Sequence, residues 1–324
     1  MVKLETMEEE IKTTKLRFPY LTTAALVFLI VLVGFLISVI IIQNQKITNN
    51  KSNKKVSLIE TKSAKAIFDN LSDSEKQSAD DLIREQVRLI LSRPQFFPSV
   101  EVVKKNEQTI NQEAEKQQIP KEVAIGIAML ENGGSESAVS SAGAAGIFQI
   151  TEGTAKQLGL EVTDENDERL DPQKNIAAGI SYLNENLKLF SDIGLAVWAY
   201  HAGPQNVSVA LKTYLQSIGE KDAYTYTEAQ QEGLLDRAKY VWRAYITKGE
   251  INVHRLLQNP KVQLLALAGL SDETELYPYK VAASSIIWDT KSKYQTEDEF
   301  KQKVSEFNQG KILLDDFLIP KKSN

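Results

Sequence analysis

Glu131 is the residue of this sequence best placed to carry out acid–base chemistry. It ends an apolar run, residues 123–130 (VAIGIAML), and is followed by a stretch rich in Gly, Ser and Ala. Burial in an apolar helix disfavours the charged form of a carboxyl group, and so does the negative end of the helix dipole. Both effects raise the pKa of the Glu131 carboxyl, as a general acid working near neutral pH requires.

The small residues after Glu131 bear on whether it meets a ligand. Residues 133–146 contain only small side chains apart from one Glu and one Val. Small side chains let two backbones approach closely, or let a bulky ligand such as a polysaccharide lie against the chain. The alternative is that Glu131 is a polar residue at a helix end that faces solvent.

Composition excludes several kinds of chemistry. The 324 residues include no cysteine, so disulfides, thiolate zinc sites and a cysteine nucleophile are excluded. The two histidines, His201 and His254, are far apart in the sequence, which argues against a histidine metal site. The net charge of −5 argues against duplex nucleic acid as a partner. We expect no metal and no cofactor, and chemistry based on carboxylates, hydroxyls or amides.

One segment predicts a membrane anchor. Residues 21–42 (LTTAALVFLIVLVGFLISVIII) carry no charge and are long enough to cross the hydrocarbon core of a bilayer. A buried core helix and a cleaved signal peptide are the alternatives, but a signal peptide has a shorter apolar region and ends at small residues. Lysines flank both ends of the segment, so the positive-inside rule does not give its orientation.

The rest of the chain is typical of an all-α protein. Ser72 or Ser74 is a candidate N-cap for a helix. This helix should end at the Pro-containing stretch after residue 92. Pro120 is placed to begin the helix that leads to Glu131, and the glycines at 133 and 134 to end it. Asp171 precedes Pro172 and is most simply an N-cap. No strand pattern and no internal repeat is evident.

Three blocks, in order, resemble the lytic transglycosylases of the soluble-lytic-transglycosylase (SLT) family. The blocks are ENGGSESAVSSAGAAGIFQIT at 131–151, LDPQKNIAAGISYL at 170–183 and AVWAYHAGPQNV at 196–207. The resemblance implies an all-α catalytic domain similar to goose-type lysozyme. It also implies cleavage of the glycan strands of peptidoglycan.

The resemblance assigns roles to four residues by matching positions. Glu131 takes the place of the catalytic acid of the family, and Gln149 that of a glutamine lining the saccharide cleft. Tyr200 matches a tyrosine near the acid, and Tyr240 matches one that contacts its carboxyl group, although the Glu-Thr pair that usually precedes it is absent. The alternatives are a backbone-bonded buried amide for Gln149 and aromatic core packing for both tyrosines.

Two departures from the family pattern fall in the expected substrate site. Asn132 stands where the family usually has Ser, and His201 where it most often has Asn. An amide can still bind substrate, and a neutral imidazole can both donate and accept. Because imidazole also titrates near neutral pH, His201 could add a pH dependence. We therefore expect both residues to contact the substrate.

A single acid is sufficient if the substrate assists. The N-acetyl group of N-acetylmuramic acid (MurNAc) attacks its own anomeric carbon, and its 6-hydroxyl then closes a 1,6-anhydro ring. Two carboxylates are the more common arrangement in glycosidases. The other acids nearby occupy no catalytic position of the family: Glu136, Glu152, Asp164 and Asp167. A muramidase of the same fold and a non-catalytic wall-docking module remain the alternatives.

These features divide the chain into five expected segments. Because peptidoglycan lies outside the cell membrane, we expect a single-pass membrane protein with an extracytoplasmic catalytic domain. The segments are a cytoplasmic tail (1–20), a transmembrane anchor (21–42), a stalk with a helical juxtamembrane part (43–103), the lysozyme-like domain (104–250) and a C-terminal helical segment without an interpretable motif (251–324).

Overall fold

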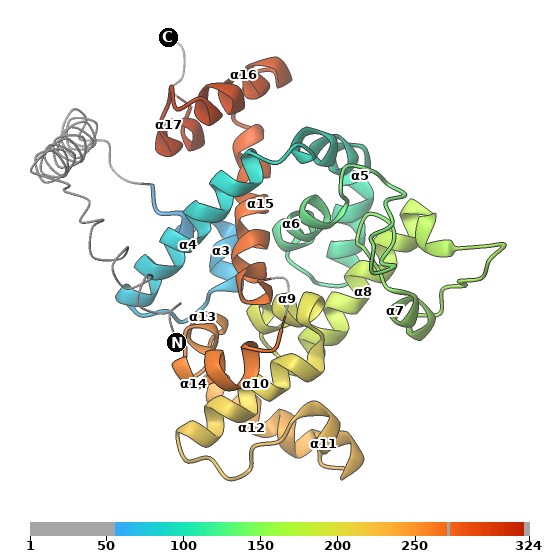
Figure 1. Ribbon diagram of the computed structural model, residues 1–324, viewed down its shortest axis with the longest axis vertical. Coiled ribbons are helices and arrows are strands. Elements are labelled where there is room, and N and C mark those ends of the chain that lie inside the picture. The colour runs from blue at the N-terminus through green and yellow to red at the C-terminus, as the bar shows by residue number, and fades with distance from the viewer. Residues whose placement is uncertain (1–55, 271–272, 321–324) are drawn as a thin grey trace, which may run out of the picture. The chain divides into compact units, whose positions relative to one another are not determined.

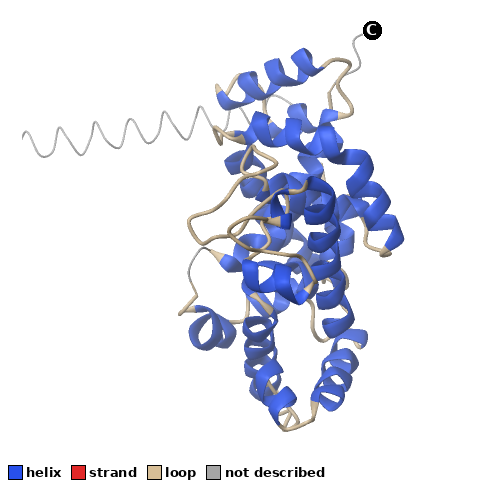
Figure 2. Cartoon of the chain, turned by 90° about the vertical axis from the view of Figure 1, so that its right-hand side faces the viewer, coloured by secondary structure: helices blue, strands red, loops and turns tan. Residues whose placement is uncertain are grey.

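The computed structural model describes residues 56–270 and 273–320. The predicted membrane anchor at 21–42 lies outside these residues. Over the described ranges the chain folds into helices joined by loops, without a named strand (Figures 1 and 2). The all-α prediction is therefore confirmed for this part of the chain. No helix within these ranges combines the length and the apolar character needed to cross a membrane.

The first helices of the described chain lead to Glu131. They are η1 (Leu58–Glu60), α3 (Lys62–Ile67), α4 (Asp73–Leu91), α5 (Phe96–Lys116) and α6 (Lys121–Glu131).

A long loop, residues 132–151, separates α6 from the next group of helices. These are α7 (Glu152–Gln157), η2 (Glu168–Leu170), α8 (Pro172–Phe190), α9 (Ile193–Ala202), α10 (Pro204–Ser217), α11 (Tyr226–Gln231) and α12 (Leu235–Thr247).

The C-terminal part is also helical, as its sequence predicts. It comprises α13 (Val253–Leu257), α14 (Pro260–Val262), the π-helix η3 (Gln263–Leu267), η4 (Thr274–Leu276), α15 (Tyr277–Lys291), α16 (Glu297–Asn308) and α17 (Leu314–Leu318).

The predicted helix ends are confirmed by their capping contacts. Ser72 caps α4 in a capping box with Glu75, which satisfies two free backbone N–H groups. The Asp171 carboxylate accepts from the backbone N–H of Lys174 at 2.9 Å and so caps α8. Gly133 (φ 56°) and Gly134 (φ 89°) follow α6 in the left-handed conformation that glycine adopts most readily.

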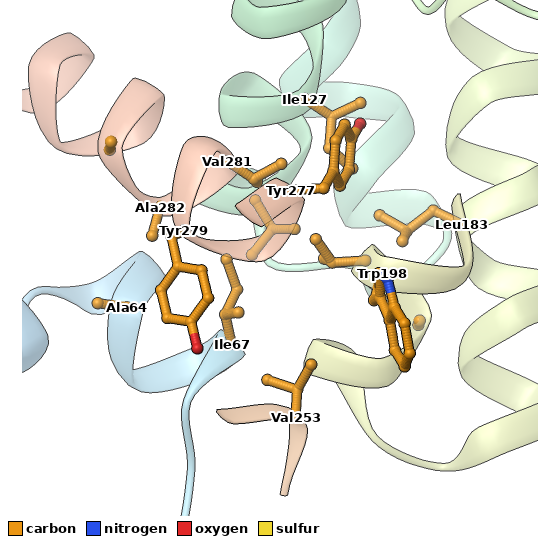
Figure 3. Packing of buried hydrophobic residues seen from close by; sticks show 14 of the residues in the cluster. Ala64, Ile67, Ile127, Leu183, Trp198, Val253, Tyr277, Tyr279, Val281 and Ala282 are labelled. Carbon is orange, nitrogen blue, oxygen red and sulfur yellow. The ribbon is translucent and has the colours of Figure 1, made fainter. Parts of the chain in front are cut away.

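Helix α15 joins the C-terminal segment to the same core as the predicted catalytic helices. It lies between α4 and α6 and also packs against α3 and α9 (Figure 1). Its Tyr277, Val281 and Ala282 lie near Ile67 and Ile127 of the earlier helices (Figure 3). The sequence predicted helices here but no role for them. The five segment boundaries themselves stay predictions.

A glycine allows α6 and α15 to approach closely. A Cβ atom added to Gly126 would lie 2.5 Å from the backbone oxygen of Val281 and 3.1 Å from its Cγ1 atom. Only a residue without a side chain fits at that distance, so α15 packs almost backbone to backbone against α6. The close contact fixes the position of the N-terminal end of α15 relative to Glu131.

Candidate active site

Glu131 and Tyr277 form the central polar contact of the candidate site. The hydroxyl of Tyr277 donates to Oε1 of Glu131 at 2.6 Å, across 146 residues of sequence. Glu131 is the last residue of α6 and Tyr277 the first residue of α15, so the packing of these two helices brings the pair together. Tyr277 is buried, whereas Glu131 keeps partial exposure. Glu131 is therefore not fully enclosed by the fold, and Tyr277 binds one of its two carboxyl oxygens.

Burial raises the pKa of Glu131 to about 7, from an ordinary value of 4.5. The hydrogen bond from Tyr277 and the positive charges of Arg93 and Lys280 act in the opposite direction, but the loss of water outweighs them. At pH 7 the protonated and ionised forms of the carboxyl are thus present in comparable amounts. The elevated pKa expected from the sequence agrees with this environment.

Two aromatic rings flank this pair. The ring of His201 stacks on that of Tyr277, with 4.5 Å between centroids and 8° between planes. The hydroxyl of Tyr200 donates to the backbone oxygen of Phe148 at 2.6 Å. Burial, and then the nearby charge of Glu131, raise the pKa of both Tyr200 and Tyr277 well above the usual tyrosine value. Both hydroxyls therefore stay protonated and act as hydrogen-bond donors.

The loop after Glu131 is held by residues of the second sequence block. Nδ2 of Asn175, in α8, donates to the backbone oxygen of Ala145 at 2.9 Å, and its Oδ1 accepts from the N–H of Phe148 at 2.7 Å. Gly146 (φ 81°) lies so close that an added Cβ would be 2.2 Å from Asn175 Nδ2. A Cβ added to Gly179 would likewise be 2.4 Å from Phe148 Cβ. These contacts explain why an Asn and two glycines are needed at these positions.

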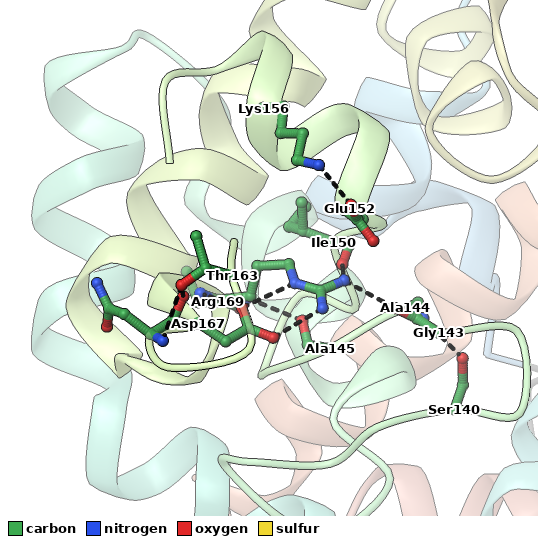
Figure 4. Close-up of polar contacts among 12 residues, drawn as sticks. Ser140, Gly143, Ala144, Ala145, Ile150, Glu152, Lys156, Thr163, Asp167 and Arg169 are labelled. Carbon is green, nitrogen blue, oxygen red and sulfur yellow. Dashed lines mark hydrogen bonds and ion pairs between the residues drawn. The ribbon is translucent and has the colours of Figure 1, made fainter. Parts of the chain in front are cut away.

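A buried arginine fixes the same loop from another side (Figure 4). Arg169 pairs with Asp167 at 2.7 Å, and its Nη1 donates to the backbone oxygens of Gly143 at 2.8 Å and Ile150 at 3.3 Å. The loop has few large side chains to bury, so these polar contacts take over part of the role of a core. They pre-organise the backbone beside Glu131.

Gln149 lines a cavity together with Tyr200 and His201. The cavity has a volume of about 260 Å³, and Tyr182 also contributes to it. Gln149 adopts φ 46° and donates both amide hydrogens to backbone, to Ala138 at 3.0 Å and to Gly146 at 2.9 Å. Its carbonyl oxygen is then the part of the amide that can accept from a ligand hydroxyl. Three of the predicted binding residues are thus brought together.

Asn132 lies inside the fold, contrary to the expected substrate contact. Its side chain has no exposed surface. Nδ2 donates to the backbone oxygens of Ala128 at 2.8 Å and Ser99 at 3.2 Å, and Oδ1 accepts from the N–H of Gly134 at 2.7 Å. All of the polar groups of the amide are engaged in ending α6 and joining it to α5. The structure therefore gives Asn132 a structural position and not a substrate-binding one.

Tyr240 lies on the surface. The sequence assigned the contact with the Glu131 carboxyl group to Tyr240, but Tyr277 makes this contact. Tyr240 is 75% exposed on α12, and the carboxyl group of Glu131 accepts from Tyr277 instead. Sequence reasoning missed Tyr277 because it lies outside the three blocks and reaches Glu131 only through helix packing. The available signal was local: Pro278, which follows it, marks the start of a helix.

The other nearby carboxylates are engaged in surface or loop contacts. Hydrogen bonds lower the pKa of three of these carboxylates. Asn106 and Lys105 donate to Glu136, Lys156 donates to Glu152, and Arg169 donates to Asp167. Asp164 is exposed in a loop. Within residues 56–270 and 273–320 no group of acidic or histidine side chains is arranged to hold a metal ion. Among these carboxylates, Glu131 alone has the raised pKa of a general acid.

Comparison with known proteins identifies the segment that contains Glu131. Residues 108–222 match the family model described as Transglycosylase SLT domain. The chain is 30% identical over 106 residues to the transglycosylase of Enterobacteria phage PRD1. The aligned segment covers 33% of this chain and 38% of that protein. It is 30% identical over 136 residues to membrane-bound lytic murein transglycosylase D of Escherichia coli K12, covering 41% of this chain and 30% of that protein.

Two further similarities were found. The soluble lytic murein transglycosylase of E. coli K12 is 33% identical over 123 residues, covering 35% of this chain and 18% of that protein. A solved structure of an inactive mutant of the lytic transglycosylase Slt from Pseudomonas aeruginosa aligns with a TM-score of 0.37 and 20% identity, covering 72% of this chain and 36% of that one.

The chain therefore contains an SLT transglycosylase domain and is a distant homologue of lytic murein transglycosylases. It spans less than two fifths of the length of these curated relatives. The resemblance inferred from the three blocks is confirmed. Tyr277 lies beyond the matched residues 108–222.

Proposed function

We propose that this protein is a membrane-anchored lytic transglycosylase of peptidoglycan, with Glu131 as its general acid and base. It cleaves the β-1,4 bond between MurNAc and N-acetylglucosamine (GlcNAc) without water and leaves a 1,6-anhydroMurNAc end. The observation that carries the proposal is the Glu131 carboxyl, whose pKa is raised to about 7 by burial, within an SLT domain. The relatives named for action on murein support this substrate class.

The proposed reaction uses the carboxyl of Glu131 twice. In its protonated form it donates to the glycosidic oxygen as the bond to the MurNAc anomeric carbon breaks and the N-acetyl oxygen of the same sugar bonds to that carbon. The resulting carboxylate takes the proton of the 6-hydroxyl, whose oxygen displaces the N-acetyl oxygen and closes the anhydro ring. Glu131 ends protonated, ready for another cycle. A pKa near the working pH suits both steps.

Tyr277 positions the acid in this scheme. Its hydroxyl binds Oε1 of Glu131 and stays protonated, so it favours the carboxylate that forms after the first proton transfer. The stack of His201 on Tyr277 limits the movement of the phenol ring. Oε2 of Glu131 is then the oxygen that we assign to proton transfer. The cavity lined by Gln149, Tyr200 and His201 is assigned to the glycan strand.

The activity should depend on pH through Glu131. The first step needs the protonated acid, and that form is lost as the pH rises through a pKa of about 7. We expect kcat/KM for soluble glycan strands to be level between about pH 5 and 6 and to fall about tenfold per pH unit above 7. Initial rates across this range would measure it. A descending limb near 4.5, the ordinary glutamate value, would contradict the assignment.

The proposed location is the outer face of the cell membrane. Residues 21–42 would form the single span, and residues 43–324 would lie outside, where peptidoglycan is. Protease added to intact cells stripped of their wall is expected to digest the part after the span and to spare a cytoplasmic control protein. Full protection of that part would contradict both the topology and the access to substrate.

A further inference from the structure

A second, larger cavity lies between the junction of η1 and α3 (residues 60–62) and helices α5, α6 and α15. Its volume is about 550 Å³, within the range of roughly 300–1,000 Å³ that small-molecule sites occupy. Glu131, Gln149, Tyr200 and His201 do not line it. It is thus separate from the candidate active site, although α6 and α15 contribute to both.

The inner wall of this cavity combines apolar side chains with unpartnered polar atoms. Ile125, Ile286 and Trp288 provide the apolar surface. Ser285 is 1% exposed, and its hydroxyl has no hydrogen-bond partner among the described residues. The same holds for the buried Oδ1 atom of Asn111. A buried polar atom without a partner is uncommon in native proteins and suggests that a ligand or water completes it.

Three partly buried carboxylates also line the cavity: Glu107, Glu122 and Asp289. Within the described chain, the side chains of Glu107 and Asp289 make no ion pair or hydrogen bond. Burial, and then the charge of Glu122, raise the pKa of Asp289 despite opposing effects of Lys293, Lys62 and Lys121. The cavity is therefore lined by hydrogen-bond acceptors that have no basic partner in direct contact at Glu107 and Asp289.

The lysines of this cavity lie at its rim. The side chain of Lys62 is 81% exposed, with its Nζ 3.8 Å from Glu122. Lys121 and Lys293 are exposed as well, and Nζ of Lys293 donates to the backbone oxygen of Leu318 at 3.1 Å. Glu60, also at the rim, pairs with Lys65 at 2.8 Å. These contacts leave Glu107 and Asp289 available to a cation that enters from outside.

We propose that this cavity binds a primary ammonium group carried on an aliphatic chain. Glu107 and Asp289 accept from the ammonium, and the aliphatic chain lies against Ile125, Ile286 and Trp288. Two sources supply this chemistry, a free alkyl diamine or an amine side chain of a peptide. The inference does not depend on the proposed function.

Calorimetric titration of the purified full chain in detergent tests the site. We expect 1,5-diaminopentane to bind with one-to-one stoichiometry and 1-pentanol, which lacks the charge, not to bind. Asp289→Asn and Glu107→Gln should each weaken binding about tenfold or more, because a hydrogen bond between charged groups is lost. Glu115→Gln, an exposed residue of α5 outside the cavity, is the matched control and should bind as the unaltered chain does.

A second pair of probes separates the two sources of the amine. Nα-acetyl-lysine amide presents the amine as a peptide would, and its Nε-acetylated form lacks the charge. Binding of the first and not the second assigns the site to a peptide-borne amine, whereas binding of the diamine alone assigns it to a free amine. Absence of binding by every amine, equal binding of 1-pentanol, or unchanged affinity in both variants would overturn the proposal.

Discussion

Replacement of Glu131 by Gln is expected to abolish wall lysis while leaving the fold intact. The amide cannot donate a proton to the glycosidic oxygen or take one from the 6-hydroxyl, and general acid–base catalysis contributes on the order of 10²–10⁴-fold in rate. The side-chain oxygen of Gln can still accept from Tyr277, and removal of a buried ionisable group adds no desolvation cost. Solubilisation of purified peptidoglycan and thermal denaturation would measure the two effects.

Glu152→Gln is the matched control for this experiment. Glu152 begins α7 and pairs with Lys156 on the surface. The substitution makes the same change, from one carboxylate to an amide, as Glu131→Gln. We expect its activity to stay within about twofold of the unaltered protein, since surface ion pairs contribute little. Substantial lysis by a folded Glu131→Gln variant would assign the chemistry to another residue. Loss of activity in Glu152→Gln would indicate a second catalytic carboxylate.

Tyr277→Phe is expected to lower kcat about 10- to 100-fold with a smaller change in KM. A hydrogen bond to a charged group contributes roughly 1.5–3 kcal/mol, and this bond is strongest to the carboxylate form of Glu131. Its loss also removes an effect that lowers the pKa of Glu131, so the descending limb of the pH profile should move above 7. Rates measured across pH test both consequences.

Tyr279→Phe, on the same helix, separates positioning from general damage to α15. The hydroxyl of Tyr279 bonds to Nδ1 of His254 at 2.8 Å and not to Glu131. This variant loses one buried hydrogen bond, yet its pH profile should match that of the unaltered protein. Equal shifts of the pH profile in both variants would mean that Tyr277 acts through the stability of α15. No change of kcat in Tyr277→Phe would remove its positioning role.

The helices and their ends follow from local chemistry and were predictable. Ser72, Asp171 and the Gly133–Gly134 pair act within one turn of chain, so the residue types alone indicate them. Gln149, Tyr200 and His201 were found through the three blocks, and the structure brings them to one cavity. Their roles in binding stay predictions, as does that of Glu131 in catalysis.

The partner of Glu131 depends on packing across 146 residues, which no local pattern encodes. Tyr240 matched the position of that partner in the family, although the usual preceding Glu-Thr pair is absent, and its helix carries it to the surface. The contact of Tyr277 with Glu131 instead depends on the close approach of α15 to α6 at Gly126. Asn132 was assigned to substrate because it stands at a family position that usually holds Ser, whereas the end of α6 turns its amide inward. The direction in which each of these side chains points is set by the tertiary fold.

The chemical identity of the glycan ends that the full chain produces distinguishes a lytic transglycosylase from a muramidase. The 6-hydroxyl is held beside the reacting carbon, and proximity of this kind reaches effective molarities of about 10⁵ M or more, above any concentration of water. Mass spectrometry of digested peptidoglycan should therefore find 1,6-anhydroMurNAc ends, lighter by one water than hydrolysed ends. Predominantly reducing MurNAc ends would contradict the proposed reaction and indicate a muramidase, and no release from several wall types would indicate a docking module.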